Sequence, residues 1–161
     1  MTLRRYTRHD DFHALHMLLH QAFAHMEGRI DPPSSMTRLT PDGLRGMADE
    51  CEIWVLEQRD QPIACMILTP EDGNLYLGKL AVSHPHRAQG HARDLIHHAE
   101  DRCRALRLAG LTLETRIELT ENHSAFSSLG FRTIGSTAHP GYDHPTSLTM
   151  FKPVTTQELH S

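Results

Sequence analysis

The sequence lacks the features that mark several large classes of protein. Its 161 residues include only three cysteines and no apolar run approaching the 18 or so residues of a membrane span. Cys51, Cys65 and Cys103 lie far apart in hydrophobic surroundings, which favours reduced core thiols over a disulfide or zinc framework. No apolar signal-peptide core follows Met1. We therefore expect a cytoplasmic protein with no membrane partner.

An excess of charge of one sign is also missing. The 16 Lys and Arg residues stand against 20 Asp and Glu residues, a formal net charge of −4. This balance gives no general electrostatic attraction to nucleic acid, so we expect none as a partner. The composition, 39% hydrophobic and 22% charged, is typical of a globular chain. At this length we expect residues 1–161 to form a single domain.

Histidine is abundant, with 14 residues. Four of them share one stripe of the first expected helix, at spacings of four, three and four residues: His9, His13, His16 and His20. Neither a His-Glu-x-x-His nor a Cys-x-x-Cys pattern accompanies them, so we predict no metal site. His97 and His98 are expected to face out of a later helix. We interpret the excess as a surface property.

The hydrophobic periodicity alternates between strand and helix patterns. A short strand over Leu3 to Thr7 is followed by a helix that should end near Gly28. The later expected elements are a weak helix over 41–47, strands over 51–57, 62–68 and 75–82, a helix over 92–106, a strand over 111–115, a helix over 121–129, and strands over 131–137 and 146–152. This order predicts an α/β (α+β) layer fold with a mixed sheet.

The densest chemical signal follows the strand that ends at Val82. After a proline-containing turn, a helix opens on Arg87-x-x-Gly90-x-Ala92. The first turn of a helix has unpaired N–H groups and partial positive charge, and small residues let a phosphate approach the backbone. The Walker and dinucleotide-binding patterns are both absent. The loop therefore indicates a diphosphate site, the alternative being a strand-to-helix turn that merely contains a glycine.

From Leu75 onward this segment resembles motif A of the GNAT superfamily, the acyl-CoA-dependent N-acyltransferases. A second stretch, from Leu119 through Asn122 to Leu129-Gly130-Phe131, resembles the family's asparagine-containing helix that ends in Leu-Gly-Phe. The resemblance covers roughly residues 50 to 152. It implies the GNAT fold, a mixed, mostly antiparallel central sheet flanked by helices.

The resemblance also implies acetyl-CoA as cosubstrate, and with no metal-ligand pattern present we expect no metal cofactor. Backbone groups of Leu80 and Val82 would pair with pantetheine, while Asn122 would touch it from the far side, where two strands splay apart. The residues implied at the CoA site are Leu80, Ala81, Val82, Arg87, Ala88, Gln89, Gly90, His91, Ala92, Arg93, Asn122 and Phe126. The implied reaction is acetyl transfer to a primary amine of a small molecule by direct attack, in a protein that forms a homodimer.

One departure from the family pattern concerns catalysis. Many members carry a tyrosine that protonates the departing thiolate, and this sequence has Phe126 at that position. Phenylalanine cannot donate a proton, so a non-catalytic CoA-binding or regulatory module is an alternative. A protein N-terminal or lysine acetyltransferase is another.

The proton-transfer groups are not fixed by spacing. An amine of pKa about 10 is almost wholly protonated at pH 7, a handicap of roughly 4 kcal/mol, so a base matters more than an acid. Glu27 and His123 are candidate bases. Candidate partners of the thiolate are Tyr76, Ser127, Ser128 and Tyr142.

Two cations are candidate substrate contacts. Lys79 lies inside a strand that should be buried, so it must be paired or face a cavity. We expect it to reach along the strand or pair with Glu114, with contact to substrate as the alternative. Arg116, just after the next strand, has the same ambiguity. If both face the cleft, they favour a carboxylate-bearing acceptor.

Overall fold

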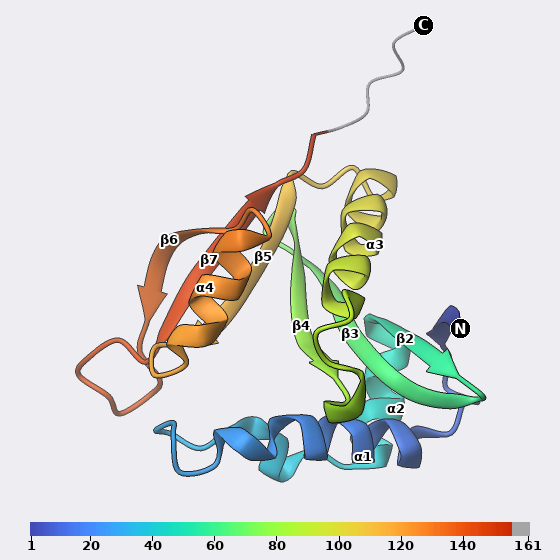
Figure 1. The fold of residues 1–161 in the computed structure, drawn as a ribbon. Helices are drawn as coiled ribbons and strands as arrows, with labels where there is room; N and C mark the ends of the chain where they lie inside the picture. The colour runs from blue at the N-terminus through green and yellow to red at the C-terminus, as the bar shows by residue number, and fades with distance from the viewer. Residues whose placement is uncertain (156–161) are drawn as a thin grey trace, which may run out of the picture.

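The computed structural model describes residues 1–155 and contains a seven-stranded sheet flanked by four α-helices (Figure 1). In spatial order the sheet runs β1-β2-β3-β4-β5-β7-β6, and only the β4–β5 pair is parallel. The strands are β1 (Thr2–Tyr6), β2 (Glu52–Gln58), β3 (Gln61–Glu71), β4 (Asn74–Val82), β5 (Gly110–Arg116), β6 (Arg132–Thr137) and β7 (Ser147–Pro153). The predicted α/β (α+β) class and mixed, mostly antiparallel sheet are confirmed.

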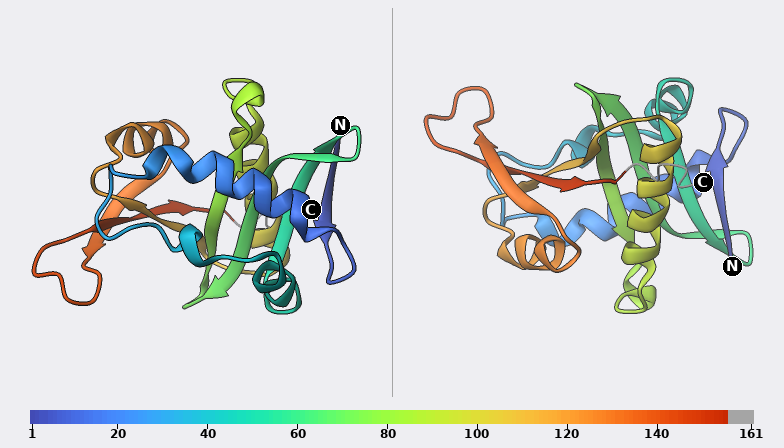
Figure 2. Two further views of the ribbon diagram at one scale, coloured as in Figure 1. Left: turned by 90° about the horizontal axis from the view of Figure 1, so that it is seen from below. Right: turned by 90° about the horizontal axis from the view of Figure 1, so that it is seen from above.

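Helices cover both faces of the sheet (Figure 2). They are α1 (Phe12–Phe23), α2 (Pro41–Glu50), α3 (His91–Ala105) and α4 (Thr120–Ser128), with 3-10 turns η1 (Ala24–Met26), η2 (Ser35–Arg38) and η3 (His84–His86). Strand β3 is buried on both sides: Cys65 and Ile67 pack in the cluster with α1 and α2, whereas Met66 and Leu68 pack in the cluster with α3. This explains its continuous apolar run.

Parallel strands β4 and β5 pair only at their beginnings. Leu75 pairs with Leu111 and Tyr76 with Thr112, and beyond these pairs the strands diverge (Figure 1). Because β4 and β5 form no backbone pairs beyond this point, backbone groups on this edge of the second half of β4 face an opening instead of β5.

A β-bulge distorts β4 beside this opening. Cys65 of β3 pairs with Ala81 but Ile67 pairs with Gly78, so Lys79 and Leu80 together oppose a single residue of β3. Lys79 adopts a φ of 51°, a left-handed conformation that is costly for a residue with a side chain.

The α-helices differ in how their N-termini are satisfied. Asp11 caps α1 by accepting a 2.9 Å hydrogen bond from the His13 amide, and Thr40 caps α2 by accepting a 3.0 Å bond from the Gly43 amide. Helix α3 follows Gly90, at a φ of 85°, without any side-chain cap. Its first amides therefore remain available to a ligand.

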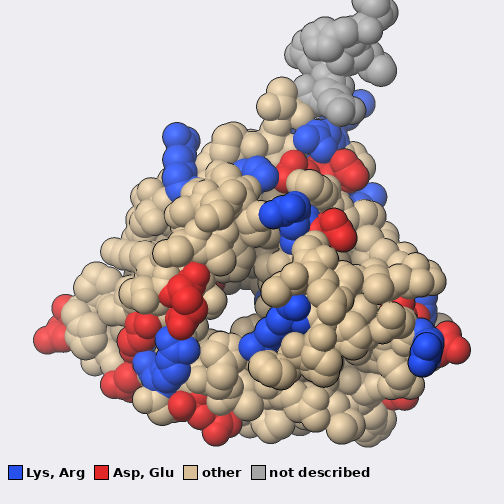
Figure 3. Space-filling model, viewed as in Figure 1, with Lys and Arg blue, Asp and Glu red and all other residues tan. Residues whose placement is uncertain are grey.

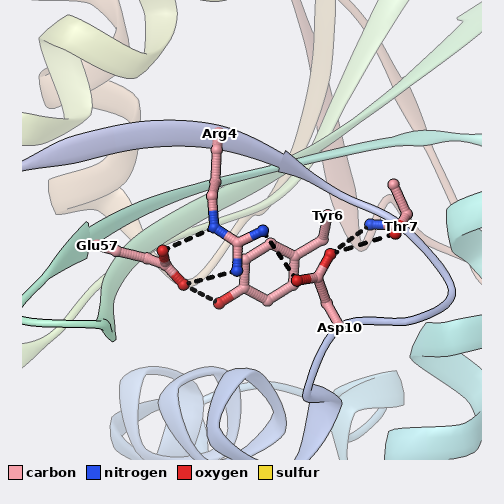
Figure 4. Close-up of polar contacts among 5 residues, drawn as sticks. All are labelled: Arg4, Tyr6, Thr7, Asp10 and Glu57. Atoms are coloured by element: carbon pink, nitrogen blue, oxygen red, sulfur yellow. Dashed lines mark hydrogen bonds and ion pairs between the residues drawn. The ribbon is translucent and has the colours of Figure 1, made fainter.

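A partly buried polar cluster links the N-terminal strand to the sheet (Figure 4). The Arg4 guanidinium donates to both carboxylate oxygens of Glu57, at 2.7 and 3.2 Å, and also contacts Asp10 at 2.8 Å. The Tyr6 hydroxyl donates to Glu57 as well, and the Thr7 amide donates to Asp10 at 2.7 Å. The hydrogen bonds from Arg4 hold the pKa of Glu57 below its usual range.

We expect Glu57→Gln to lower the free energy of unfolding by about 2 kcal/mol at pH 7, because charge-assisted bonds to a buried carboxylate are replaced by weaker ones. Because folding lowers the pKa of Glu57, its contribution is fully present above the unfolded value of about 4.3 and is lost as pH falls through the folded value. Urea unfolding should therefore separate the two proteins at neutral pH and show them converging in acid.

A matched control for this change is Asp42→Asn, which removes an exposed ion pair with Arg45. That variant should cost less than about 0.5 kcal/mol. A Glu57→Gln penalty that is equally small, or that grows as pH falls, would contradict the assigned role of the cluster.

Several local predictions are corrected. The α-helix of α1 ends at Phe23 and continues only as the 3-10 turn η1, before Gly28. His98 does not face outward: its ring packs edge-on against Trp54, with centroids 4.2 Å apart, because β2 brings the indole under α3. All three cysteines are free, and Cys65 and Cys103 are buried as expected.

The described part of the chain contains neither a metal-binding cluster nor a membrane-spanning helix. Within residues 1–155 no group of three or more His, Cys, Asp or Glu side chains is placed to hold a metal ion. Among the same residues, no helix is long and apolar enough to cross a membrane.

Candidate functional site

Two adjoining cavities occupy the opening between β4 and β5. The loop-side cavity, about 680 Å³, lies between the end of β4, the loop before α3, and α4. The inner cavity, about 540 Å³, lies between the bulge of β4, the end of β5 and the segment around η2. Figure 3 shows the opening on one face of the molecule, with Lys and Arg atoms at its edge. Five residues line both cavities and form their junction: Phe23, Met26, Leu80, Asn122 and Phe126.

The loop-side cavity is lined by residues that the sequence analysis predicts to bind CoA. All of them line it except Gln89, whose side-chain oxygen instead lies 3.2 Å from Nε2 of His91. The residues concerned are Leu80, Ala81, Val82, Arg87, Ala88, Gly90, His91, Ala92, Arg93, Asn122 and Phe126. The arrangement places strand end, loop and α4 around one space.

The start of α3 is electrostatically suited to an anion. The first intrahelical bond runs from the Asp94 amide to the Gly90 carbonyl at 3.0 Å, so the amides of residues 91–93 have no partner within the helix. Ala88 and Gly90 both have positive φ, which turns successive amides toward one side of the loop. The helix dipole and the nearby guanidinium of Arg93 add positive potential.

Arg87 reaches back across the loop-side cavity. Its Nε donates to the Val82 carbonyl and its Nη2 to the Ala22 carbonyl, each at 3.3 Å. The Val82 carbonyl, which the resemblance assigns to pantetheine, is thus already engaged by a side chain. His91 is buried on the other flank, and its Nδ1 has no hydrogen-bond partner among residues 1–155.

The inner cavity brings together charged groups from β4 and β5. Lys79 Nζ donates to Ser35 Oγ at 3.1 Å, so the expected pairing with Glu114 is wrong: the bulge turns the side chain toward η2. Burial lowers the pKa of Lys79, and no carboxylate within residues 1–155 pairs with it. Arg116 Nη2 donates to the Pro33 carbonyl at 3.3 Å, and its buried Nη1 has no partner among the described residues.

The candidate proton-transfer residues separate into two groups. Tyr76 lines the inner cavity, and burial raises its pKa to about 12, so its hydroxyl keeps its proton at neutral pH. Ser128 lines the loop-side cavity, where its hydroxyl donates to the Ser124 carbonyl at 3.0 Å. Ser127 is exposed on α4 and lines neither cavity.

Three other candidates also line neither cavity. Glu27 lies on a smaller side pocket, described below. The ring of His123 donates from Nε2 to the Arg116 carbonyl at 2.8 Å, and the Tyr142 hydroxyl donates to Asp31. The last two side chains are therefore held by neighbouring residues outside the two cavities.

The inner cavity also contains residues that the sequence does not single out as site residues, among them Ser35, Arg38, Glu114 and His139. Glu114 is the only carboxylate on the wall among residues 1–155. Its place on β5, two residues before Arg116, is the sequence signal that could have found it. Ser35, Arg38 and His139 come from connecting segments without periodicity, so no pattern marked them.

At the junction, Phe126 takes the place of the tyrosine found in many family members. Its ring packs edge-on against Phe131, with centroids 5.7 Å apart. Asn122 carries the only polar side chain among the five junction residues. A group at the junction thus meets mostly apolar surface and one amide.

The sequence model described as "Acetyltransferase (GNAT) family" matches residues 12–131. No curated protein matches the sequence significantly. Many solved structures share the fold.

Three of these structures illustrate the likeness. The PaiA N-acetyltransferase of Thermoplasma acidophilum, in complex with coenzyme A, has a TM-score of 0.79 at 11% identity, over 94% of this chain and 98% of that chain. A GNAT family acetyltransferase of Elizabethkingia anophelis with acetyl-CoA bound has a TM-score of 0.68 at 15% identity, over 94% and 97%. The ribosomal-protein-S18-alanine N-acetyltransferase of Escherichia coli has a TM-score of 0.66 at 18% identity, over 99% and 97%.

Proposed function

Because the chain belongs to the GNAT acetyltransferase family, we propose that it transfers an acetyl group from acetyl-CoA to the primary amine of a small molecule, which attacks the thioester directly. The observation that carries the proposal is the pair of cavities that meet at the opening between β4 and β5. One cavity offers a phosphate-binding helix start, and the other offers polar groups within a volume suited to a small molecule. Direct attack is favoured over a cysteine-linked acyl-enzyme, since Cys51, Cys65 and Cys103 line neither cavity.

Acetyl-CoA fits the loop-side cavity by its chemistry. The pyrophosphate would bind the free amides of residues 91–93, with Arg87 and Arg93 adding positive charge. Pantetheine has two amides and would extend along β4 beyond Tyr76, where β5 no longer pairs with it. For this, the Arg87 side chain must release the Val82 carbonyl and turn toward the phosphates.

The thioester would then lie at the junction of the cavities. The bulge at Lys79 and Leu80 frees a backbone amide of β4 from the sheet ladder, and such an amide stabilises the negative charge that develops on the acetyl oxygen. An amine in the inner cavity would attack from the other side of Leu80. The acetyl group of acetyl-CoA and the acceptor amine would thus come together beside the bulge of β4.

Glu114 is the proposed proton acceptor for the amine. It is the carboxylate on the inner-cavity wall among the described residues, whereas Glu27 and His123, proposed from the sequence, line neither main cavity. Phe126 cannot protonate the departing thiolate. The Asn122 amide can donate a hydrogen bond to it, and a thiol of pKa about 8.5 is a fair leaving group near neutrality.

The experiment that tests this function measures two properties of the purified protein. Acetyl-CoA should raise the melting temperature, and CoA should be released when a panel of small primary amines is added. Stabilisation without turnover on any amine or peptide would favour the alternative of a non-catalytic CoA-binding module. Turnover on peptide N-termini or lysines alone would favour a protein acetyltransferase, and no stabilisation by acetyl-CoA would contradict the proposal.

A further inference from the structure

The side chains of two cationic residues contact the same short segment of the inner-cavity wall. Lys79 extends from β4 to Ser35, and Arg116 extends from β5 to Pro33, so both ends reach residues two apart in the chain. A third cation, Arg38, lines the same cavity. None of the three forms an ion pair with an acid of residues 1–155.

The acids nearby form no ion pair with these cations within residues 1–155. Glu114 is the only one on the cavity wall among the described residues. Asp31 accepts from the Tyr142 hydroxyl, and Glu118 accepts from the Asp31 amide at 3.1 Å. Gathering like charges in a partly buried cavity without an ion-paired carboxylate is unfavourable, and an anion bound between them lowers that penalty. A planar guanidinium beside an ammonium suits a carboxylate.

A smaller apolar pocket adjoins the inner cavity. This side pocket, about 240 Å³, shares with the inner cavity the residues Phe23, Met26, Pro33, Ser34, Met36 and Thr37. Met26, Ile30 and Met36 on its wall are almost fully buried, and its polar surface is small although His20 and Glu27 also line it. Such a pocket accepts an aliphatic or aromatic group and offers a charged group few partners.

We propose that the acceptor is an apolar α-amino acid, whose carboxylate binds between Lys79 and Arg116 and whose side chain enters the side pocket. This proposal rests on the proposed function and adds the substrate class. The amine is left directed toward Glu114 and the junction, where the acetyl group is supplied. The bound carboxylate would also form an ion pair with the Lys79 ammonium group.

The test compares acetylation of L-leucine, L-leucinamide and L-serine by the full chain. We expect kcat/KM for leucine to exceed that for leucinamide by about 30-fold, because only leucine makes the charge-assisted carboxylate contact. We expect it to exceed that for serine by about 10-fold, because the leucine side chain buries more apolar surface. The amide's amine loses its proton more readily, a bias toward leucinamide that the carboxylate contact must outweigh. Equal rates for leucine and leucinamide would overturn the proposal.

Substitutions at Lys79 and Arg116 test whether these two side chains cause the preference for leucine over leucinamide. Lys79→Met and Arg116→Gln should each lower kcat/KM for leucine by about 30-fold, mainly through KM, and change the leucinamide rate less than threefold. Lys79→Arg, which keeps the charge, should retain most of the leucine rate. Arg5→Gln, at an exposed position on β1, is the matched control and should change neither rate. Variants that slow both substrates equally would overturn the carboxylate contact.

A binding measurement separates this proposal from the proposed function. On protein saturated with CoA, N-acetyl-L-leucine should bind about 10-fold more tightly than its primary amide in calorimetry, with or without turnover. Equal affinities would overturn the substrate class while leaving acetyl transfer intact. Failure of acetyl-CoA itself to bind would instead reject the proposed function.

Discussion

Replacing Ala92 with aspartate is expected to raise the Kd for acetyl-CoA more than about 100-fold without lowering the melting temperature. Ala92 lies in the first turn of α3 and lines the loop-side cavity. A carboxylate there would face the pyrophosphate, and two unit charges 4 Å apart repel by about 4 kcal/mol at the effective dielectric constant near a protein surface. A 100-fold rise in Kd corresponds to a loss of about 2.8 kcal/mol of binding free energy, which is less than this repulsion.

The same substitution should leave the fold unharmed or slightly more stable. Acidic residues in the first turn interact favourably with the helix dipole, by about 0.3–1 kcal/mol. Isothermal titration with acetyl-CoA and thermal unfolding of the apo protein measure the two effects separately. Ala92→Ser adds a small side chain without charge and is the control. Unchanged affinity in Ala92→Asp would mean that the pyrophosphate binds elsewhere.

Replacing Glu114 with glutamine is expected to lower kcat/KM about 100-fold at pH 7, because a positioned general base contributes at least that factor. The amide keeps the shape of the side chain but cannot take the proton. The Kd for acetyl-CoA should stay within twofold, since Glu114 lines the inner cavity and not the loop-side one. Raising the pH should restore part of the lost rate, because more of the amine is then neutral.

Steady-state kinetics over a pH series checks this expectation. Glu50→Gln, an exposed carboxylate at the end of α2, is the control and should retain full activity. A Glu114→Gln enzyme with nearly normal kcat/KM would show that another group, such as His139 on the same wall, accepts the proton.

The fold followed from local patterns in the sequence. Apolar spacing along α1 and α3, glycine-marked turns and alternation in the strands are each properties of one segment, so they predict that segment's structure. The loop from Arg87 to Arg93 was identified for the same reason: strand, turn, glycine and helix follow one another in the chain. The structure places this loop on the wall of the loop-side cavity, and its binding of CoA stays a prediction.

The inner cavity could not be predicted in this way, because segments far apart in the sequence build it. The apolar run from Leu75 to Val82 has the pattern of one continuous strand and gives no sign of the bulge that turns the Lys79 side chain toward Ser35, 44 positions away in the chain. His98 was misplaced for a similar reason, since Trp54 comes from β2. The cytoplasmic location and homodimer remain predictions from the sequence.

The most direct test of the account is a crystal structure of the protein with coenzyme A. We expect the pyrophosphate on the amides of residues 91–93, pantetheine extended along β4 beyond Tyr76, and the sulfur at the junction formed with Leu80, Asn122 and Phe126. A CoA molecule bound outside the opening between β4 and β5, or with its sulfur away from the inner cavity, would contradict the proposed function.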